Sequence, residues 1–175
     1  MEKEHSNLLK ESFRIFYEKH SAAFLNFIRK ACGGDEATAR DIFQESFLRL
    51  FRSSPRGLNE YQLKSYLFKT AFRLVIDEKR KQREEPLEDR IFPGTSHDDN
   101  TDFRMDITGA FARLDKKSRT LLLLAHVEGY SYREISEITG IKESSLKVTL
   151  FRARRKFEQI LRSSGFTQGG RDERR

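Results

Sequence analysis

The stretch YREISEITGIKESSLKVTLFRARRKF, from Tyr132 to Phe157, decides the fold of the C-terminal part of this chain. It opens with a short amphipathic pattern that ends at Gly140, where the backbone is expected to take a positive φ angle. Ile141 closes the corner, and a second helical pattern begins within about four residues, which is the spacing of a helix-turn-helix. A small core is expected to fix the two helices at a steep angle, formed by Ile135, Ile138, Ile141, Leu146 and Leu150.

The second of these helices, from about Ser144 to Leu161, presents one apolar and one polar, basic face. Such a helix fits the major groove of duplex DNA, because Arg and Lys side chains reach guanine edges or phosphates there. A solvated basic face on an ordinary helical hairpin is the alternative, and the coincidence of turn, corner residue and basic face favours groove binding. Phe151 falls on the basic face. The predicted DNA contacts are Ser144, Ser145, Lys147, Val148, Arg152 and Arg155.

Basic charge is concentrated in two segments that an acidic segment separates. The 175 residues include 34 Lys and Arg against 27 Asp and Glu, and this net charge of +7 raises nucleic acid as a partner. Residues 64–83 and 142–162 each hold seven basic and two acidic residues, whereas residues 84–106 hold eight acidic residues and two Arg. We therefore predict two basic domains, 8–83 and 107–163, joined by a flexible acidic linker at 84–106 and followed by a disordered tail at 164–175. For the linker, the alternative is an ordinary surface loop inside one domain.

Helical periodicity runs through almost the whole chain, so the predicted fold class is all-α, with two small helical domains. Three helices are expected in the first domain: Leu8–Arg29, with a break near His20–Ser21, then Asp35–Arg52 and Ser65–Lys81. Asp35 is the expected N-cap of the second of these helices. Domains below about 80 residues bury a small fraction of their surface, so partner contacts are expected to help order the arrangement.

One face of the Asp35–Arg52 helix is a candidate docking surface for another protein. It lies opposite the apolar stripe of that helix and combines acidic and amide side chains with one Leu: Asp41, Gln44, Glu45 and Leu48. An apolar contact framed by charges favours docking of a specific partner helix. An ordinary solvated helix face would show the same spacing.

The Ser65–Lys81 helix interleaves basic and aromatic residues. Cations track phosphates while aromatic rings stack on unpaired bases, so this pattern suits single-stranded or opened DNA. The preceding loop, Arg56–Tyr61, is expected to be mobile enough to hold a flipped base. The predicted contacts of this region are Arg56, Asn59, Tyr61, Tyr66, Lys69, Arg73 and Arg80.

The sequence gives no support for an enzyme, a metal site or a cofactor. It contains no GxxxxGK[ST] or GxGxxG loop, no HExxH motif, and no Ser or Cys nucleophile with a credible base. The single cysteine, Cys32, cannot form an internal disulfide, and a semi-buried inert thiol is favoured over a redox-sensitive one. No apolar run approaches the ~18 residues of a membrane span and no signal peptide is recognised, so a cytoplasmic protein is expected.

Two blocks of the sequence resemble the extracytoplasmic-function (ECF) sigma factors of bacterial RNA polymerase. ARDIFQESFLRLF at 39–51, preceded by GDE at 34–36, and SYLFKTAFRLVIDEKR at 65–80 resemble region two of that family. LDKKSR at 114–119, EGYSYREI at 128–135 and SLKVTLFRAR at 145–154 resemble region four. The matches cover most of residues 8–162 in the family's order, with its acidic linker between them.

The resemblance implies a role for each candidate surface. The Asp41–Leu48 face would dock on the coiled coil of the largest subunit of core RNA polymerase. The Arg56–Tyr61 loop and the Tyr66–Arg80 helix would recognise and open the −10 promoter element, and the Ser144–Arg155 face would read the −35 element. Catalysis would belong to the polymerase, and an anti-sigma factor is expected as a further partner.

The chain also departs from residues that are usual in the family. Tyr66 stands where the family often has Trp, Arg73 where it often has Asn, and Val148-Thr149 where Ser-Arg is usual, so one expected cationic contact is missing. These departures leave the promoter sequence open. Two other functions are open: a stand-alone helix-turn-helix regulator that binds duplex operators as a dimer, and, on charge alone, an RNA-binding accessory protein.

Overall fold

The computed structural model describes residues 2–53, 57–81 and 107–164 of the chain. These residues form α1 (Glu2–Ala31), α2 (Glu36–Ser53), α3 (Glu60–Lys81), a short helical segment at 107–112, α5 (Lys116–His126), α6 (Tyr132–Thr139) and α7 (Glu143–Ser163). Within these ranges no residue is in a β-strand, and the predicted all-α fold class is confirmed. The predicted linker at 84–106 lies outside the described residues, as does the tail beyond Ser164.

Helices α1, α2 and α3 form the N-terminal lobe, whose core is rich in phenylalanine. Phe24 of α1 meets Phe47 of α2 and Phe68 of α3, with ring centroids 5.6 Å and 5.4 Å apart and near-perpendicular planes. Edge-to-face packing of this kind is favourable beyond the burial of apolar area. The aromatic core therefore fixes how the outer faces of α2 and α3 are presented.

The predicted break in the first helix near His20–Ser21 is wrong, because α1 continues without interruption to Ala31. The His20 ring lies 4.7 Å from the Phe16 ring one turn earlier, and its Nε2 lies 3.0 Å from Oε1 of Glu60 at the start of α3. Burial lowers the pKa of His20, and the hydrogen bond to Glu60 opposes that shift. A contact with a residue 40 positions away thus secures the helix where the local sequence suggests an interruption.

Local caps set where α2 and α3 begin. The Asp35 carboxylate accepts hydrogen bonds from the backbone N–H and the hydroxyl of Thr38, which confirms its predicted place at the start of α2. Helix α3 begins at Glu60, earlier than the predicted Ser65. Asn59 and Gln62 cap this start reciprocally, since each side-chain oxygen accepts a hydrogen bond of 2.9 Å from the other's backbone N–H.

The C-terminal lobe, residues 107–164, contains the predicted helix-turn-helix. Ser131 caps α6 together with Glu134 in a capping box, and Gly140 ends this helix with φ 74°. A positive φ angle is strained for a residue that carries a Cβ atom, so the sharp turn into α7 requires glycine at position 140. The predicted small core is confirmed: Ile135, Ile138, Leu146 and Leu150 are all buried, and Ile141 is partly buried against them.

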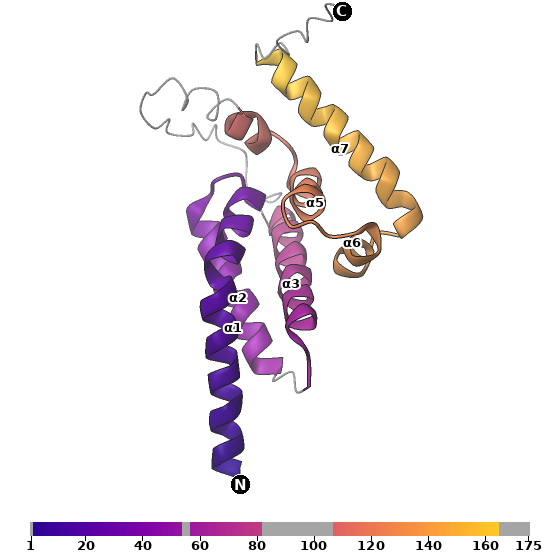
Figure 1. Cartoon of the computed structure of the whole chain (residues 1–175). Coiled ribbons are helices and arrows are strands. Elements are labelled where there is room, and N and C mark those ends of the chain that lie inside the picture. Colours follow the sequence, from indigo (N-terminus) through magenta and orange to yellow (C-terminus); the bar gives the residue numbers. More distant parts are fainter. Residues whose placement is uncertain (1, 54–56, 82–106, 165–175) are drawn as a thin grey trace, which may run out of the picture.

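The two lobes pack against one another and share one continuous hydrophobic core. Figure 1 shows α5 and α6 lying between α3 and α7, and α5 also contacts α1. Arg119 of α5 crosses this interface almost fully buried. Its Nε donates to the carbonyl of Ala31 at the end of α1 over 2.9 Å, and its Nη1 donates to the carbonyl of Ala112 over 2.6 Å. The guanidinium occupies the place that a side chain at Gly33 would need.

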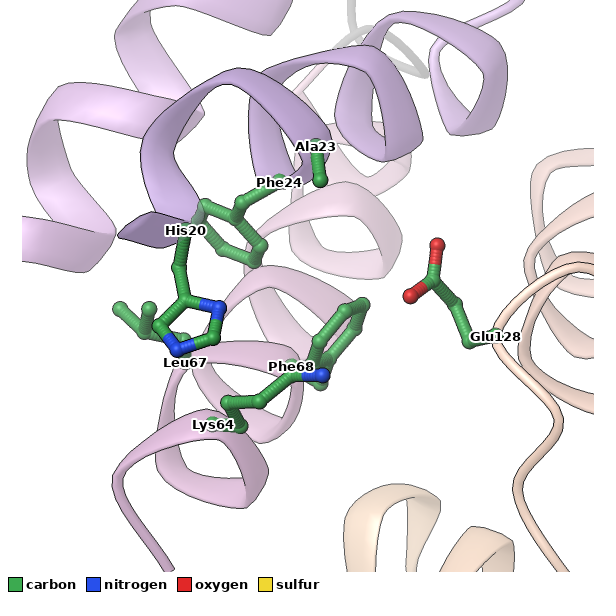
Figure 2. A pocket seen from close by; sticks show the side chains of 7 residues that line it. All are labelled: His20, Ala23, Phe24, Lys64, Leu67, Phe68 and Glu128. Atoms are coloured by element: carbon green, nitrogen blue, oxygen red, sulfur yellow. The ribbon is translucent and has the colours of Figure 1, made fainter. Parts of the chain in front are cut away.

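A second part of the interface surrounds a small cavity between α1, α3 and the segment that joins α5 to α6. Figure 2 shows Glu128 extending toward this cavity, opposite His20 and Lys64. The cavity has a volume of about 30 Å³, which suits a single water molecule. Burial raises the pKa of Glu128, and the positive charges of Lys64 and Lys30 oppose this rise. Beside the cavity, the Tyr130 ring packs on Phe68 with centroids 5.3 Å apart.

Candidate nucleic-acid interface and docking surface

The basic face of α7 is open to solvent along its whole length. Helices α5 and α6 cover the opposite side of α7, where Leu146, Leu150 and Ala153 are buried. This burial fixes the rotation of α7 about its axis. Each predicted contact on the basic face is exposed: Ser144, Ser145, Lys147, Val148, Arg152 and Arg155. The structure therefore brings all six together on one accessible surface.

Phe151 belongs to the same face, although it is absent from the predicted contacts. Its side chain is 59% exposed, and the guanidinium of Arg155 lies 5.9 Å from the centroid of its ring. At this distance a cation and an aromatic face attract each other. The sequence indicates this exposure, because Phe151 falls on the side of the helix away from Leu146 and Leu150. Thr149 differs from its neighbours, because its hydroxyl donates to the carbonyl of Ser145 within the helix.

The outer face of α3 places some of its predicted contacts together. Lys69 and Arg73 are exposed, and Tyr66 is partly exposed beside them. These three residues recur at spacings of three and four, so they share one side of the helix. Arg80 lies in α3, but its side chain is not among those described, and Arg56 lies outside the described residues.

The predicted mobile loop at Arg56–Tyr61 differs from the structure in its last part. Asn59 caps α3, and Tyr61 lies in the first turn of that helix. The Tyr61 side chain lies close enough to the carboxylate of Glu134 in α6 for the two groups to interact across the lobe interface. Partial burial and the nearby carboxylate raise the pKa of Tyr61 to about 12. The difference arises because the reciprocal capping by Asn59 and Gln62 makes the end of this segment part of α3.

The candidate docking face on α2 is also accessible. Asp41, Gln44 and Leu48 are exposed and Glu45 is partly exposed, with 46% of the Leu48 surface open to solvent. Glu45 accepts a hydrogen bond of 2.6 Å from Nε of Arg49 one turn later. The face thus combines carboxylates, an amide and one apolar side chain, in the arrangement that the spacing predicts.

An apolar groove beside this face was not predicted from the sequence. Its volume is about 380 Å³, and it runs between α1 and α2 next to Gln44 and Leu48. Phe51, at its rim, is 51% exposed. Helical periodicity shows which side of each helix is apolar, but it does not show which of these aromatic residues stay at the surface. The aromatic lining consists of Phe13, Tyr17, Phe43, Phe47 and Phe51.

Over residues 2–53, 57–81 and 107–164, no group of three or more His, Cys, Asp or Glu side chains is placed to hold a metal ion. Among the described helices, none is both long and apolar enough to span a membrane. Cys32 is buried at the end of α1.

Together, the helix-turn-helix and the basic faces define a two-lobed, all-helical protein of the DNA-binding class. Comparison with protein families refines this class. The model of sigma-70 region 2 matches residues 16–85, and the model of sigma-70 region 4 matches residues 104–157. These two matches coincide with the two lobes, and each contains one of the predicted basic faces.

Individual relatives agree with the family matches. The ECF RNA polymerase sigma factor SigL of Mycobacterium tuberculosis is 27% identical over 163 residues, which are 89% of this chain and 92% of SigL. RNA polymerase sigma factor SigV of Bacillus subtilis is 30% identical over 117 residues, 66% of this chain and 70% of SigV. The chain belongs to the ECF family of RNA polymerase sigma factors.

A solved structure shares the fold. It is that of the sigma factor RpoE from Bartonella quintana in complex with the anti-sigma factor NepR. The TM-score is 0.66 at 22% sequence identity, and the match covers 87% of this chain and 98% of RpoE. At this identity the likeness concerns the fold.

Proposed function

We propose that this chain binds core RNA polymerase and directs it to promoters by reading a −10 element with α3 and a −35 element with α7. The observation that carries this proposal is the combination, in one packed molecule, of a docking face on α2 with two exposed basic faces on separate lobes. Family membership supplies the partner, since ECF sigma factors act with RNA polymerase. Nucleotide addition belongs to the polymerase, and the chain acts where polymerase and promoter are, in the cytoplasm.

The α2 face is assigned to the polymerase. Asp41, Gln44 and Glu45 supply negative charge and hydrogen-bond acceptors around the exposed Leu48. The neighbouring groove adds aromatic surface for an apolar side chain of the partner. A helix of the polymerase's largest subunit with one apolar edge and flanking basic residues fits this chemistry, because charged rims steer and orient an apolar contact.

The two basic faces are assigned to DNA in different states. On α3, Lys69 and Arg73 meet phosphates while Tyr66 offers an aromatic ring to an unpaired base, so this face suits the opened −10 region. On α7, Lys147, Arg152 and Arg155 lie on a helix free to enter a major groove, so this face suits the duplex −35 region. Asn59 and Tyr61 at the start of α3, with Arg56 and Arg80, complete the −10 assignment.

The packed arrangement adds one step to promoter binding. Tyr61 lies beside Glu134 across the lobe interface with 45% of its surface exposed, so we expect the lobes to move apart before its whole side chain contacts DNA. We assign control of this step to an anti-sigma protein that binds the sigma factor when transcription is not required. The relative solved with NepR is an example of such a complex with another member of the fold.

The test is transcription with purified core polymerase. Core enzyme plus this chain and a promoter library should produce transcripts that start at discrete positions, with two shared upstream sequences. The double variant Arg152→Ala, Arg155→Ala should lose selection of the upstream sequence while it still binds core polymerase, because the substituted side chains lie on α7 and the docking face lies on α2.

A stand-alone regulator would give a different result. It would protect palindromic duplex sites from cleavage in the absence of polymerase, since a dimeric helix-turn-helix protein reads two half-sites. Failure of the folded chain to associate with core polymerase at low salt would contradict the proposed function.

A further inference from the structure

Two apolar side chains stand in the middle of the basic face of α7. Val148 is 50% exposed and Phe151 is 59% exposed, whereas Leu146 and Leu150 of the same helix have no exposed surface. The two exposed residues are three positions apart, so they are neighbours on the helix surface. We call them the Val148–Phe151 strip. Their exposure leaves apolar area in water that a partner with matching apolar groups would cover.

The charges around the strip indicate the chemistry of that partner. Lys147, Arg152 and Arg155 are exposed on the same face and surround the two apolar side chains with positive charge. The Arg155 guanidinium also lies 5.9 Å from the centre of the Phe151 ring, a distance at which the cation and the ring attract each other. An occupant that complements this surface is anionic at its edges and carries small apolar groups at its centre. Duplex DNA meets both conditions in its major groove.

The apolar group that the major groove offers is the C5-methyl of thymine. Valine and phenylalanine have no side-chain hydrogen-bond donor or acceptor, so they cannot read guanine, adenine or cytosine by hydrogen bonding. The neighbouring hydroxyl of Thr149 is engaged with the carbonyl of Ser145 in its own helix. At the centre of the face, discrimination therefore depends on contact with methyl groups, while the flanking cations hold phosphates or guanine edges.

We propose that Val148 and Phe151 determine promoter specificity by contacting thymine methyl groups in the −35 element. This inference rests on the proposed function, because it assumes that α7 reads the upstream duplex. It specifies that the −35 sequence of this factor includes thymine at the position or positions that face the strip. It also assigns Phe151 two tasks, since the same ring touches a methyl group and positions Arg155.

The test removes the methyl group from the DNA without changing base pairing. Core polymerase and the full chain are assembled on a promoter obtained from the transcription test, and each thymine of its −35 element is replaced in turn by uracil. Replacement at one or two positions should weaken binding about fourfold each, the factor that corresponds to burial of one methyl-sized group. Val148→Ser and Phe151→Ser should each lose the uracil effect at the position that the substituted side chain faces, and the double variant Val148→Ser, Phe151→Ser should bind thymine and uracil promoters equally well.

A matched control is Val127→Ser, which changes an equally exposed valine, 58% exposed, outside α7. This variant should keep the full preference for thymine. All variants should show the helical content and thermal midpoint of the parent chain, because the substituted side chains lie at the surface. If Phe151→Ser weakens binding to thymine and uracil promoters by the same factor, Phe151 only positions Arg155, and its part in the proposal is wrong.

The inference and the proposed function fail in different ways. Discrete transcript starts together with no effect of uracil at any −35 position would overturn the methyl contact and leave the sigma factor function intact. Absence of discrete starts, or of association with core polymerase, would overturn the function itself. A uracil effect that persists in the double serine variant would also overturn the inference, because other residues would then contact the methyl groups.

Discussion

Single side chains carry the chemistry of each candidate surface, and Glu45 on α2 shows this for the docking face. Its carboxylate is partly exposed and accepts a hydrogen bond of 2.6 Å from Nε of Arg49. It lies one turn from the exposed Leu48. The acidic charge at this position frames the apolar contact. A reversal of that charge changes the rim of the surface while it leaves the aromatic core of the lobe untouched.

We expect Glu45→Arg to weaken binding of core polymerase by about tenfold or more, because like charges at an interface oppose association and Arg49 adds a second positive charge beside the new one. Co-purification with core polymerase over a salt series measures the effect. Glu137→Arg, a charge reversal at an exposed position of α6, is the control and should bind normally. Equal binding by the two variants would contradict the assignment of the α2 face.

At the scale of single elements, the helix-turn-helix could be predicted from the sequence with boundaries close to those observed. Its signals are local, since Gly140 ends α6 and the apolar residues of α6 and α7 lie within a few turns of each other. The start of α3 and the continuity of α1 were missed for a common reason. Both depend on side-chain contacts around Glu60. The contact between His20 and Glu60 supports α1 where a break was expected, and the exchange between Asn59 and Gln62 starts α3. The spacing of apolar residues along the sequence does not reveal such side-chain contacts.

The start of α5 depends on Asp115. Burial alone would raise the pKa of this carboxyl, but hydrogen bonds from Lys156 and from the backbone and hydroxyl of Ser118 outweigh burial and lower the pKa to about 2. We expect Asp115→Ala to reduce the free energy of unfolding by about 1 kcal/mol through loss of the cap. Urea denaturation at neutral pH measures this change.

The same residue predicts a dependence on pH. The folded-state pKa of Asp115 lies below its ordinary value of 3.8, so its contribution to stability is complete above that value and is lost as the pH falls toward about 2. Asp115→Asn keeps a side chain that can cap the helix but cannot titrate. Between pH 5 and pH 3 the parent chain should therefore lose more stability than this variant. Parallel curves for the two proteins would contradict the role given to the carboxylate.

At the scale of the whole molecule, the packing of the two lobes is the feature that sequence analysis left open. The Arg119 bond to Ala31 joins residues 88 positions apart, and Tyr130 meets Phe68 across the same interface. Composition predicted two basic domains, but it gives no sign that a buried arginine would join them. Burial lowers the pKa of Arg119, and its two carbonyl partners compensate for the loss of water.

We expect Arg119→Ala to reduce the free energy of unfolding by about 2–3 kcal/mol, because two buried carbonyl groups lose their donor. The radius of gyration should increase as the lobes separate. Denaturation and small-angle X-ray scattering measure the two effects. Lys117→Ala, at an exposed position of the same helix, should change neither. A variant at Arg119 that stays as compact and as stable as the parent would contradict the role of this residue at the interface.

The carboxylate of Glu134 takes part both in the cap of its own helix and in the interface between the lobes. It accepts hydrogen bonds from the backbone N–H and the hydroxyl of Ser131, which starts α6, and it lies close to Tyr61 of the other lobe. When Tyr61 departs, the two bonds from Ser131 remain, and α3 keeps its own cap at Asn59. Displacement of Tyr61 from Glu134 therefore leaves the first turns of α3 and α6 intact, so each helix keeps its starting point whatever position the other lobe takes.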